Sequence, residues 1–315
     1  MIQGIHHITL VVRDLDAAQR YYRAVAGMQC LLAEAGSTFL IGMEQFADQS
    51  SAGIKYCLLA GPNCYLLLVA AASAQAVSAT VANPINRPGI RHFCVQNHSC
   101  SILEQAVIAH GGKLIAAPLD LGTGNQYAYA RDSEGNIMEI EGLPDASAGE
   151  PTWFGHIAVV TNEMDQAAAF YTALFSTNLK SRGKFGPGPQ FDRMGGLSNV
   201  RIEGAWIAAG NLQIELWHFD EPVSPPEPAP RRMLDPGYSS ISLESDDLDA
   251  DVARLVALGG KLESGYLETE QLRLIVGSDT EGNLIELFEL TASGRASSIE
   301  ALACPGICKR VEARQ

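Results

Sequence analysis

The sequence predicts an α+β fold built from four copies of one module, which consists of a strand, a helix and about three further strands. Three pairs of matching segments indicate a duplication. They are GIHHITLVVRDLDAAQRYYRAVAG (4–27) with FGHIAVVTNEMDQAAAFYTALF (154–175), HGGKLIAAP (110–118) with LGGKLESGY (258–266), and DSEGNIMEIEG (132–142) with DTEGNLIELFE (279–289). The pairs are offset by 149, 148 and 147 residues. Matches that stay in register predict two tandem domains, at 1–143 and 151–290.

Each repeat contains an internal repeat of a strand followed by a helix. GIRHFCVQ (89–96) resembles the first strand and precedes the helical segment SCSILEQAVIAHGG (99–112). Asp or Ser before each helix suits an N-cap, and Gly27, Gly111 and Gly259 suit the helix ends. Short runs of β-branched and aromatic residues follow, as expected for strands. Residues 144–150 are expected to form a linker, and residues 291–315 form a tail without a clear period.

Composition narrows the range of functions. The chain has 315 residues, of which 47% are hydrophobic, and a net charge of -14. An acidic chain repels phosphate backbones, so no nucleic-acid partner is expected. No signal peptide is visible and the longest apolar run is too short to span a bilayer, so a soluble cytoplasmic protein without a membrane partner is expected. Seven scattered cysteines argue against a disulfide framework.

The module pattern resembles a known superfamily. Histidine on the first strand, as in HHITL, and D-x-E-G-N before the last strand are similar to the vicinal oxygen chelate superfamily of glyoxalases, bleomycin-resistance proteins and extradiol dioxygenases. The resemblance covers nearly all of residues 3–290. It implies that two modules curl their sheets around one cleft, and that metal ligands come from the first and last strand of each module.

Carried over to the first domain, the resemblance implies a metal site made by His7, His92 and Glu139. Leu66 takes the fourth position and leaves it vacant. Because strands alternate faces, His7 is expected to point away from His6. Two histidines and one carboxylate suit Fe(II) or Mn(II) first, and Zn(II) or Ni(II) next.

The second domain carries a different set. The resemblance assigns it His156, Glu215 and Glu286, with Ser240 where the first domain has His92. These residues form either a second metal site with one histidine and two carboxylates or a decayed site that is kept for packing.

Three kinds of function follow from the resemblance. One is ring cleavage by a dioxygenase, in which Tyr129 would hydrogen-bond a substrate oxygen. Another is proton transfer by a glyoxalase- or epimerase-type lyase or isomerase, with the metal as Lewis acid. The third is a binding protein that sequesters a drug. The loop 182–196 could bring Arg182 and Lys184 to an anionic substrate group. A small-molecule substrate is expected. Whether the protein forms a homodimer is left open by the sequence.

Overall fold

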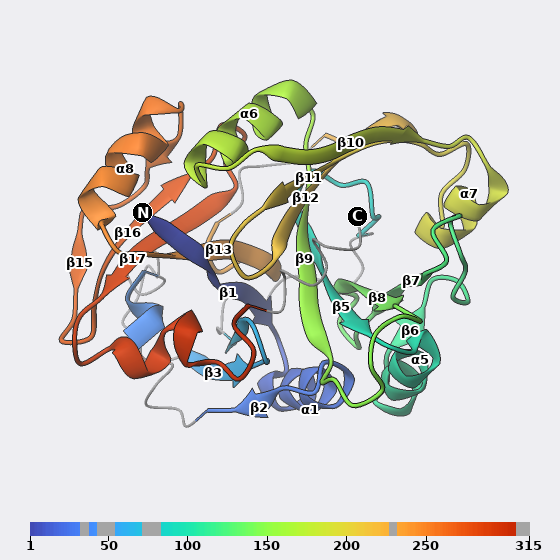
Figure 1. Ribbon diagram of the computed structural model, residues 1–315, viewed down its shortest axis with the longest axis horizontal. Coiled ribbons are helices and arrows are strands. Elements are labelled where there is room, and N and C mark those ends of the chain that lie inside the picture. The colour runs from blue at the N-terminus through green and yellow to red at the C-terminus, as the bar shows by residue number, and fades with distance from the viewer. Residues whose placement is uncertain (32–37, 43–53, 71–82, 227–231, 307–315) are drawn as a thin grey trace.

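The computed structural model describes residues 1–31, 38–42, 54–70, 83–226 and 232–306, and it contains the four expected modules (Figure 1). The first consists of β1 (Ile2–Val12), α1 (Leu15–Val25), β2 (Gln29–Cys30), η1 (Thr38–Leu40), β3 (Lys55–Ala60) and β4 (Tyr65–Ala70). The second consists of β5 (Gly89–Asn97), α5 (Cys100–Ala109), β6 (Lys113–Leu114), β7 (Gln126–Arg131) and β8 (Ile137–Gly142).

The second repeat has the same order with one additional helix. Its first module consists of β9 (Trp153–Val160), α6 (Met164–Leu174), β10 (Leu179–Phe185), α7 (Pro189–Gly195), β11 (Arg201–Ala208) and β12 (Gln213–Glu221). The last module consists of β13 (Gly237–Ser245), α8 (Leu248–Ala257), β14 (Lys261–Leu262), β15 (Leu267–Glu268), β16 (Leu272–Ser278) and β17 (Leu284–Leu290). The short helices η2 (Arg295–Ser297) and η3 (Ile299–Ala301) follow.

The D-x-E-G-N segments form turns that tie the two modules of a repeat together. Asp132 accepts hydrogen bonds from the backbone N–H groups of Glu134 and Asn136, both at 2.9 Å. It also accepts one from the Tyr22 hydroxyl on α1, at 2.9 Å. Asp279 and Tyr171 repeat this contact at 2.8 Å. A buried carboxylate with several donors is well satisfied, so the motif fixes helix and turn together.

Two mixed sheets form, and each takes one module from each repeat. Sheet A has the order β14-β16-β17-β13-β1-β4-β3-β2, with β15 beside β16, and sheet B has the order β10-β11-β12-β9-β5-β8-β7-β6. Sheet A joins the first and fourth modules through antiparallel β1 and β13, and sheet B joins the second and third through β5 and β9. The predicted α+β fold of four modules is confirmed. The modules that share a sheet, however, are not the two neighbours within one repeat.

The helices hold the two halves of a repeat together instead. In Figure 1, α1 lies beside α5 and α6 lies beside α8. Their buried residues join the helix-facing sides of both sheets in one large core, which includes Tyr22, Phe93, Tyr171 and Tyr238. Within the described ranges, no helix is long and apolar enough to cross a membrane.

The opposite faces of the two sheets differ. On sheet A this face is packed with apolar side chains from outside the sheet, including Phe39, Leu40, Met233, Ile299 and Leu302. On sheet B it borders a cavity of about 520 Å³. The two halves of the molecule therefore have the same framework, but the cavity lies on sheet B.

Candidate metal centre

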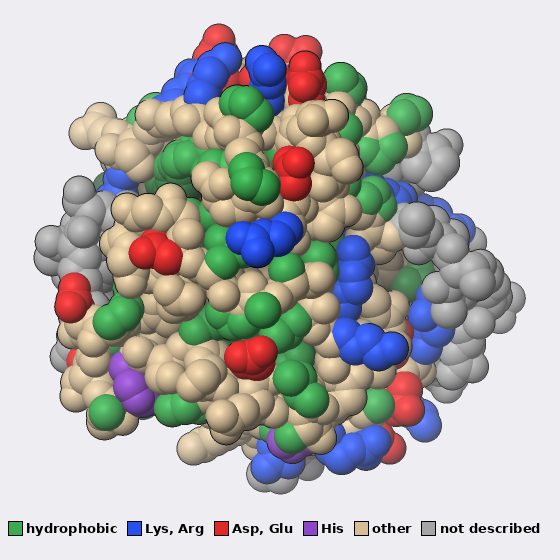
Figure 2. All heavy atoms as spheres, turned by 90° about the vertical axis from the view of Figure 1, so that its right-hand side faces the viewer, with side chains coloured by type: hydrophobic (Ala, Val, Ile, Leu, Met, Phe, Trp, Pro, Cys, Tyr) green, Lys and Arg blue, Asp and Glu red, His purple; other side chains and the backbone are tan. Residues whose placement is uncertain are grey.

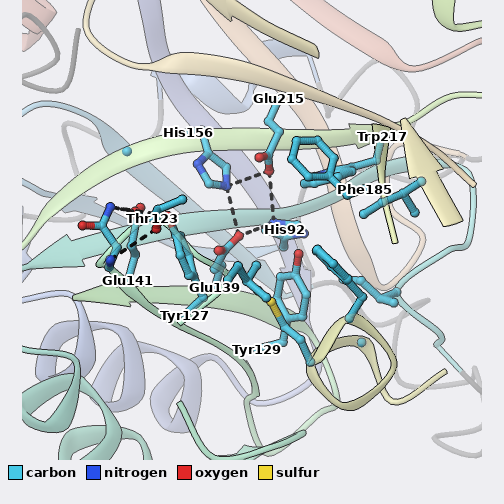
Figure 3. Close-up of a pocket in the computed structure, with 18 of the residues that line it drawn as sticks. His92, Thr123, Tyr127, Tyr129, Glu139, Glu141, His156, Phe185, Glu215 and Trp217 are labelled. Atoms are coloured by element: carbon cyan, nitrogen blue, oxygen red, sulfur yellow. Dashed lines mark hydrogen bonds and ion pairs between the residues drawn. The ribbon is translucent and has the colours of Figure 1, made fainter. Parts of the chain in front are cut away.

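Four side chains that could hold a metal ion meet at the centre of sheet B. His92, Glu139, His156 and Glu215 come from β5, β8, β9 and β12, four neighbouring strands (Figure 3). All four are buried, and one ligand atom of each lies within 4.8 Å of the others. It is the one such group of three or more His, Cys, Asp or Glu residues among the described parts of the chain.

The distances within the group are short. Glu139 Oε2 lies 3.2 Å from Nε2 of both His92 and His156. Glu215 Oε2 lies 3.0 Å from His156 Nε2 and 3.9 Å from His92 Nε2. Each histidine therefore presents the same nitrogen to the same small volume as the two carboxylates.

The group is electrostatically coupled. Burial raises the pKa of Glu139, but hydrogen bonds from His156 and His92 outweigh it and lower that pKa to about 2. Burial lowers the pKa of His156, yet the charge of Glu215 and the hydrogen bond that His156 donates to Glu139 bring it well above 6.5. Burial also lowers the pKa of His92, and Glu139 offsets only part of this. Without a metal, a proton on His156 balances part of the carboxylate charge.

The donor set fits a divalent cation. Ligand atoms about 2.1 Å from one cation lie about 3 to 4 Å apart. The distances between the histidine nitrogens and the carboxylate oxygens here are 3.0, 3.2, 3.2 and 3.9 Å. With both imidazoles neutral, two buried carboxylates carry two negative charges, which a divalent cation neutralises. Glu215 Oε2 is buried and has no hydrogen-bond partner among the described residues, so it is available as a ligand.

The cavity above this group has two unlike ends. An aromatic end is formed by Phe185, Phe191, Trp206, Trp217 and Phe219. A polar end is formed by Gln96, Thr123, Asn125, Tyr127 and Glu141. The two histidines and two glutamates lie between the two ends (Figure 3). Figure 2 shows the side of the molecule that carries α7. Hydrophobic side chains lie among acidic and basic ones on this surface.

Tyr129 lines the cavity next to the metal group. Its ring centroid lies 5.0 Å from that of His92. Burial, together with the charge of Glu139, raises the pKa of Tyr129 well above 10. The hydroxyl therefore keeps its proton and can donate a hydrogen bond. On the same strand, Tyr127 faces the polar end, where burial raises the pKa of Glu141 to about 7.

The structure separates the three residues that were expected to share a metal. His92 and Glu139 lie together on sheet B, but His7 lies on sheet A. There His7 Nε2 is 3.6 Å from Glu286 Oε2, and both side chains are fully buried. The expected grouping of His7, His92 and Glu139 is therefore corrected, because the first module pairs with the fourth and not with the second.

The second expected set is divided in the same way. His156 and Glu215 join His92 and Glu139, whereas Glu286 faces His7 and accepts hydrogen bonds from Ser240 at 3.4 Å and Ser242 at 2.7 Å. Within the described residues, the His7–Glu286 pair gains no third ligand and lies under the packed apolar face of sheet A.

Two local expectations about β1 and β4 also change. A register shift between Ile5 and His7 interrupts the alternation, so His6 and His7 point the same way, with their Nδ1 atoms 2.8 Å apart. Tyr65 pairs with His7 as Gln213 pairs with His156, which places Leu67 at the position of Glu215. Leu66 therefore faces the helices. A shift of one residue moves a side chain to the other face.

Arg182 and Lys184 lie on β10 but do not line the cavity. Alternation directs Ser181 and Phe185 inward. Arg182 instead forms ion pairs with Asp165 and Glu203, both at 2.6 Å, and Lys184 Nζ is 3.8 Å from Asp220. The loop that follows does cover the cavity, through Phe191 and Met194 of α7.

Comparison with protein families gives a match in both repeats. The model of the Glyoxalase/Bleomycin resistance protein/Dioxygenase superfamily matches residues 4–140 and 153–287. Glyoxalase I from Zea mays has a similar structure, with a TM-score of 0.62 at 15% identity over 95% of this chain and 96% of that one. A mutant of that enzyme gives a TM-score of 0.63 at 18% identity, over 91% and 92%.

A glyoxalase family protein from Bacillus cereus is 25% identical over 47% of this chain and 100% of its own length, with a TM-score of 0.42. No curated protein matches the chain. The TM-scores of the maize structures show a common fold, and the family model matches both repeats. The chain therefore belongs to the glyoxalase/bleomycin resistance protein/dioxygenase superfamily.

Proposed function

We propose that this protein is a divalent-metal enzyme that moves a proton on a carbon next to a carbonyl group, as a lyase or isomerase of the glyoxalase or epimerase type. Its substrate is a small molecule with two adjacent oxygens. The observation that carries the proposal is the buried group of two histidines and two glutamates below a cavity.

The number of protein donors favours proton transfer over oxygenation. A facial triad of two histidines and one carboxylate leaves three positions open in a six-coordinate site, enough for a chelating substrate and O₂. Here Glu215 adds a fourth donor within 4.8 Å of the others. Two positions then remain, which the two oxygens of a substrate would fill. Fe(II), Mn(II), Zn(II) and Ni(II) all suit these ligand types.

The residues have distinct roles in this proposal. A divalent cation held by the four side chains supplies Lewis acidity at the carbonyl oxygen. Glu139 Oε2 lies 3.2 Å from Nε2 of both His92 and His156, so it would hold the cation together with the two histidines. Glu215 would hold the cation through Oε2, which faces both histidines, and its other oxygen takes the proton from carbon. Tyr129 donates a hydrogen bond to a substrate oxygen.

Ring cleavage is the second candidate, and Tyr129 is the observation that favours it. Its protonated hydroxyl beside His92 suits a catecholate oxygen. This reaction requires Glu215 to leave the donor set so that O₂ has a position. A drug-sequestering protein without a metal would have no use for four converging buried ligands.

Two assays on the metal-loaded protein separate these functions. We expect α-hydroxy ketones in D₂O to exchange the hydrogen next to the carbonyl, as followed by proton NMR, without O₂ consumption. O₂ uptake with catechols and no exchange would contradict the proposal and support ring cleavage. Tight ligand binding with neither reaction would support a binding protein.

A further inference from the structure

The polar end of the cavity is organised around one carboxyl group. Gln96 Nε2 donates to Glu141 Oε2 at 2.5 Å, and Asn125 Nδ2 donates to Glu141 Oε1 at 2.9 Å. The Trp153 indole N–H donates to Gln96 Oε1 at 2.7 Å, which fixes the amide with its NH₂ group toward Glu141. Both amides of the polar end therefore direct a donor to Glu141.

This arrangement leaves acceptors for a ligand. Glu141 Oε2 also accepts from the Cys94 thiol at 3.9 Å, but Glu141 Oε1 has a further lone pair. Thr123 and Tyr127 share a hydrogen bond of 2.8 Å between their hydroxyls. A buried carboxyl group with spare acceptor capacity is best matched by a group that donates hydrogen bonds. The polar end therefore favours a hydroxyl or ammonium group over a carboxylate.

The charges around the cavity favour the same choice. Three buried carboxyl groups line it, those of Glu139, Glu141 and Glu215, and among its described lining residues none is Lys or Arg. A divalent cation offsets two of these charges. Arg182 and its ion pairs lie on the outer side of β10. An anionic group at the polar end would therefore meet like charge without a cationic partner.

The aromatic end completes the shape of the ligand. The ring of Trp217 lies edge-on to those of Trp206 and Phe185, with centroids 5.8 and 5.9 Å apart. Such walls bind planar apolar groups. Because the metal group lies between the two ends (Figure 3), a ligand that spans the cavity has its metal-binding oxygens in the middle.

We infer that the cavity binds a ligand without negative charge, in which two chelating oxygens lie between an aromatic group and a hydrogen-bond-donating group. The chelating part of this inference rests on the proposed metal function. The selection against an anionic tail rests on the residues of the polar end alone.

Three benzohydroxamates that differ only in the substituent on nitrogen test this selection. The substituents are 2-aminoethyl, 2-hydroxyethyl and carboxymethyl, and binding to the metal-loaded protein is followed by tryptophan fluorescence. We expect the carboxymethyl compound to bind about tenfold or more weakly than the other two. Glu141→Gln should lower the ratio of the aminoethyl affinity to the carboxymethyl affinity about tenfold. Glu203→Gln, which removes a carboxylate on the outer side of β11, should leave the ratio unchanged.

Equal or tighter binding of the carboxymethyl compound would overturn the inference. N-(2-aminoethyl)benzamide and N-benzoylglycine repeat the comparison without the chelating hydroxyl. If the hydroxamates bind no better than these benzamides, the proposed metal function fails. If the amine still exceeds the acid among the benzamides, the selectivity of the polar end stands by itself.

Discussion

Replacement of Glu215 by glutamine is expected to lower the rate of proton exchange by about two to four orders of magnitude, the range for loss of a general base. The amide oxygen of glutamine can still ligate a cation, so bound metal should be retained. The change replaces the oxygen that takes the proton by an NH₂ group and leaves an amide oxygen to face His156 Nε2, as Glu215 Oε2 does at 3.0 Å. The exchange rate per bound metal, from NMR and a measurement of metal content, separates the role of Glu215 as base from its role as metal ligand.

Glu221→Gln is the matched control, because Glu221 ends the same strand and its side chain is 53% exposed. It should leave the exchange rate unchanged. A Glu215→Gln protein with a normal rate per metal would show that another group takes the proton.

The largest effect on stability is expected from the double substitution Ile299→Ala and Leu302→Ala. Both side chains are buried on sheet A, in the cluster with Phe39 and Phe288. Truncation of a buried Ile or Leu to Ala costs about 2–5 kcal/mol, so the free energy of unfolding should fall by about 4 kcal/mol or more. Urea denaturation followed by circular dichroism measures it.

The same segment also has polar contacts that the double substitution leaves in place. Ser298 Oγ and the backbone N–H of Ile299 donate to buried Glu244, at 2.5 and 2.9 Å. Glu300→Ala, at an exposed position of η3, should stay within about 0.5 kcal/mol of the parent. Equal stability of the double variant and this control would show that the tail segment does not hold sheet A together.

The fold could be predicted because its signals are local and repeated. The D-x-E-G-N turns and the strand–helix pairs recur at nearly constant spacing. Asp14 and Asp247 cap their helices through the N–H groups of Ala17 and Ala250, whereas Ser99 and Glu163 before α5 and α6 make no side-chain cap hydrogen bond. Each of these features acts over a few residues, so the sequence alone was enough to place it.

The grouping of the site residues depends on which modules share a sheet. No sequence feature within a single module indicates which other module it pairs with. Pairing of the two modules within one repeat, which the family resemblance implies, predicts that His7 lies beside His92. A usable signal was present, however. The second and third modules together have a ligand at all four family positions, His92, Glu139, His156 and Glu215, whereas the other two modules do not. Completeness of the donor set predicts the observed pairing.

The remaining differences come from strand alternation over single residues. The register shift next to His7 turns His6 and His7 to one side. An offset that is one residue too large places Leu66, instead of Leu67, at the position of Glu215. The charges of Arg182 and Lys184 predict that they bind substrate. Ser181 and Phe185 are, however, the residues of β10 that reach the cavity. Strand positions next to a bulge or an insertion can only be assigned once the register is known.

Metal content of the wild type, His156→Ala and His7→Ala tests the central claim most directly. After loading and desalting, about one divalent metal per chain is expected in the wild type and in His7→Ala, since His7 lies on the other sheet. His156→Ala, which removes a ligand from the centre of sheet B, should lose most of it. Retention in His156→Ala together with loss in His7→Ala would contradict this account and restore the grouping of His7 with His92 and Glu139.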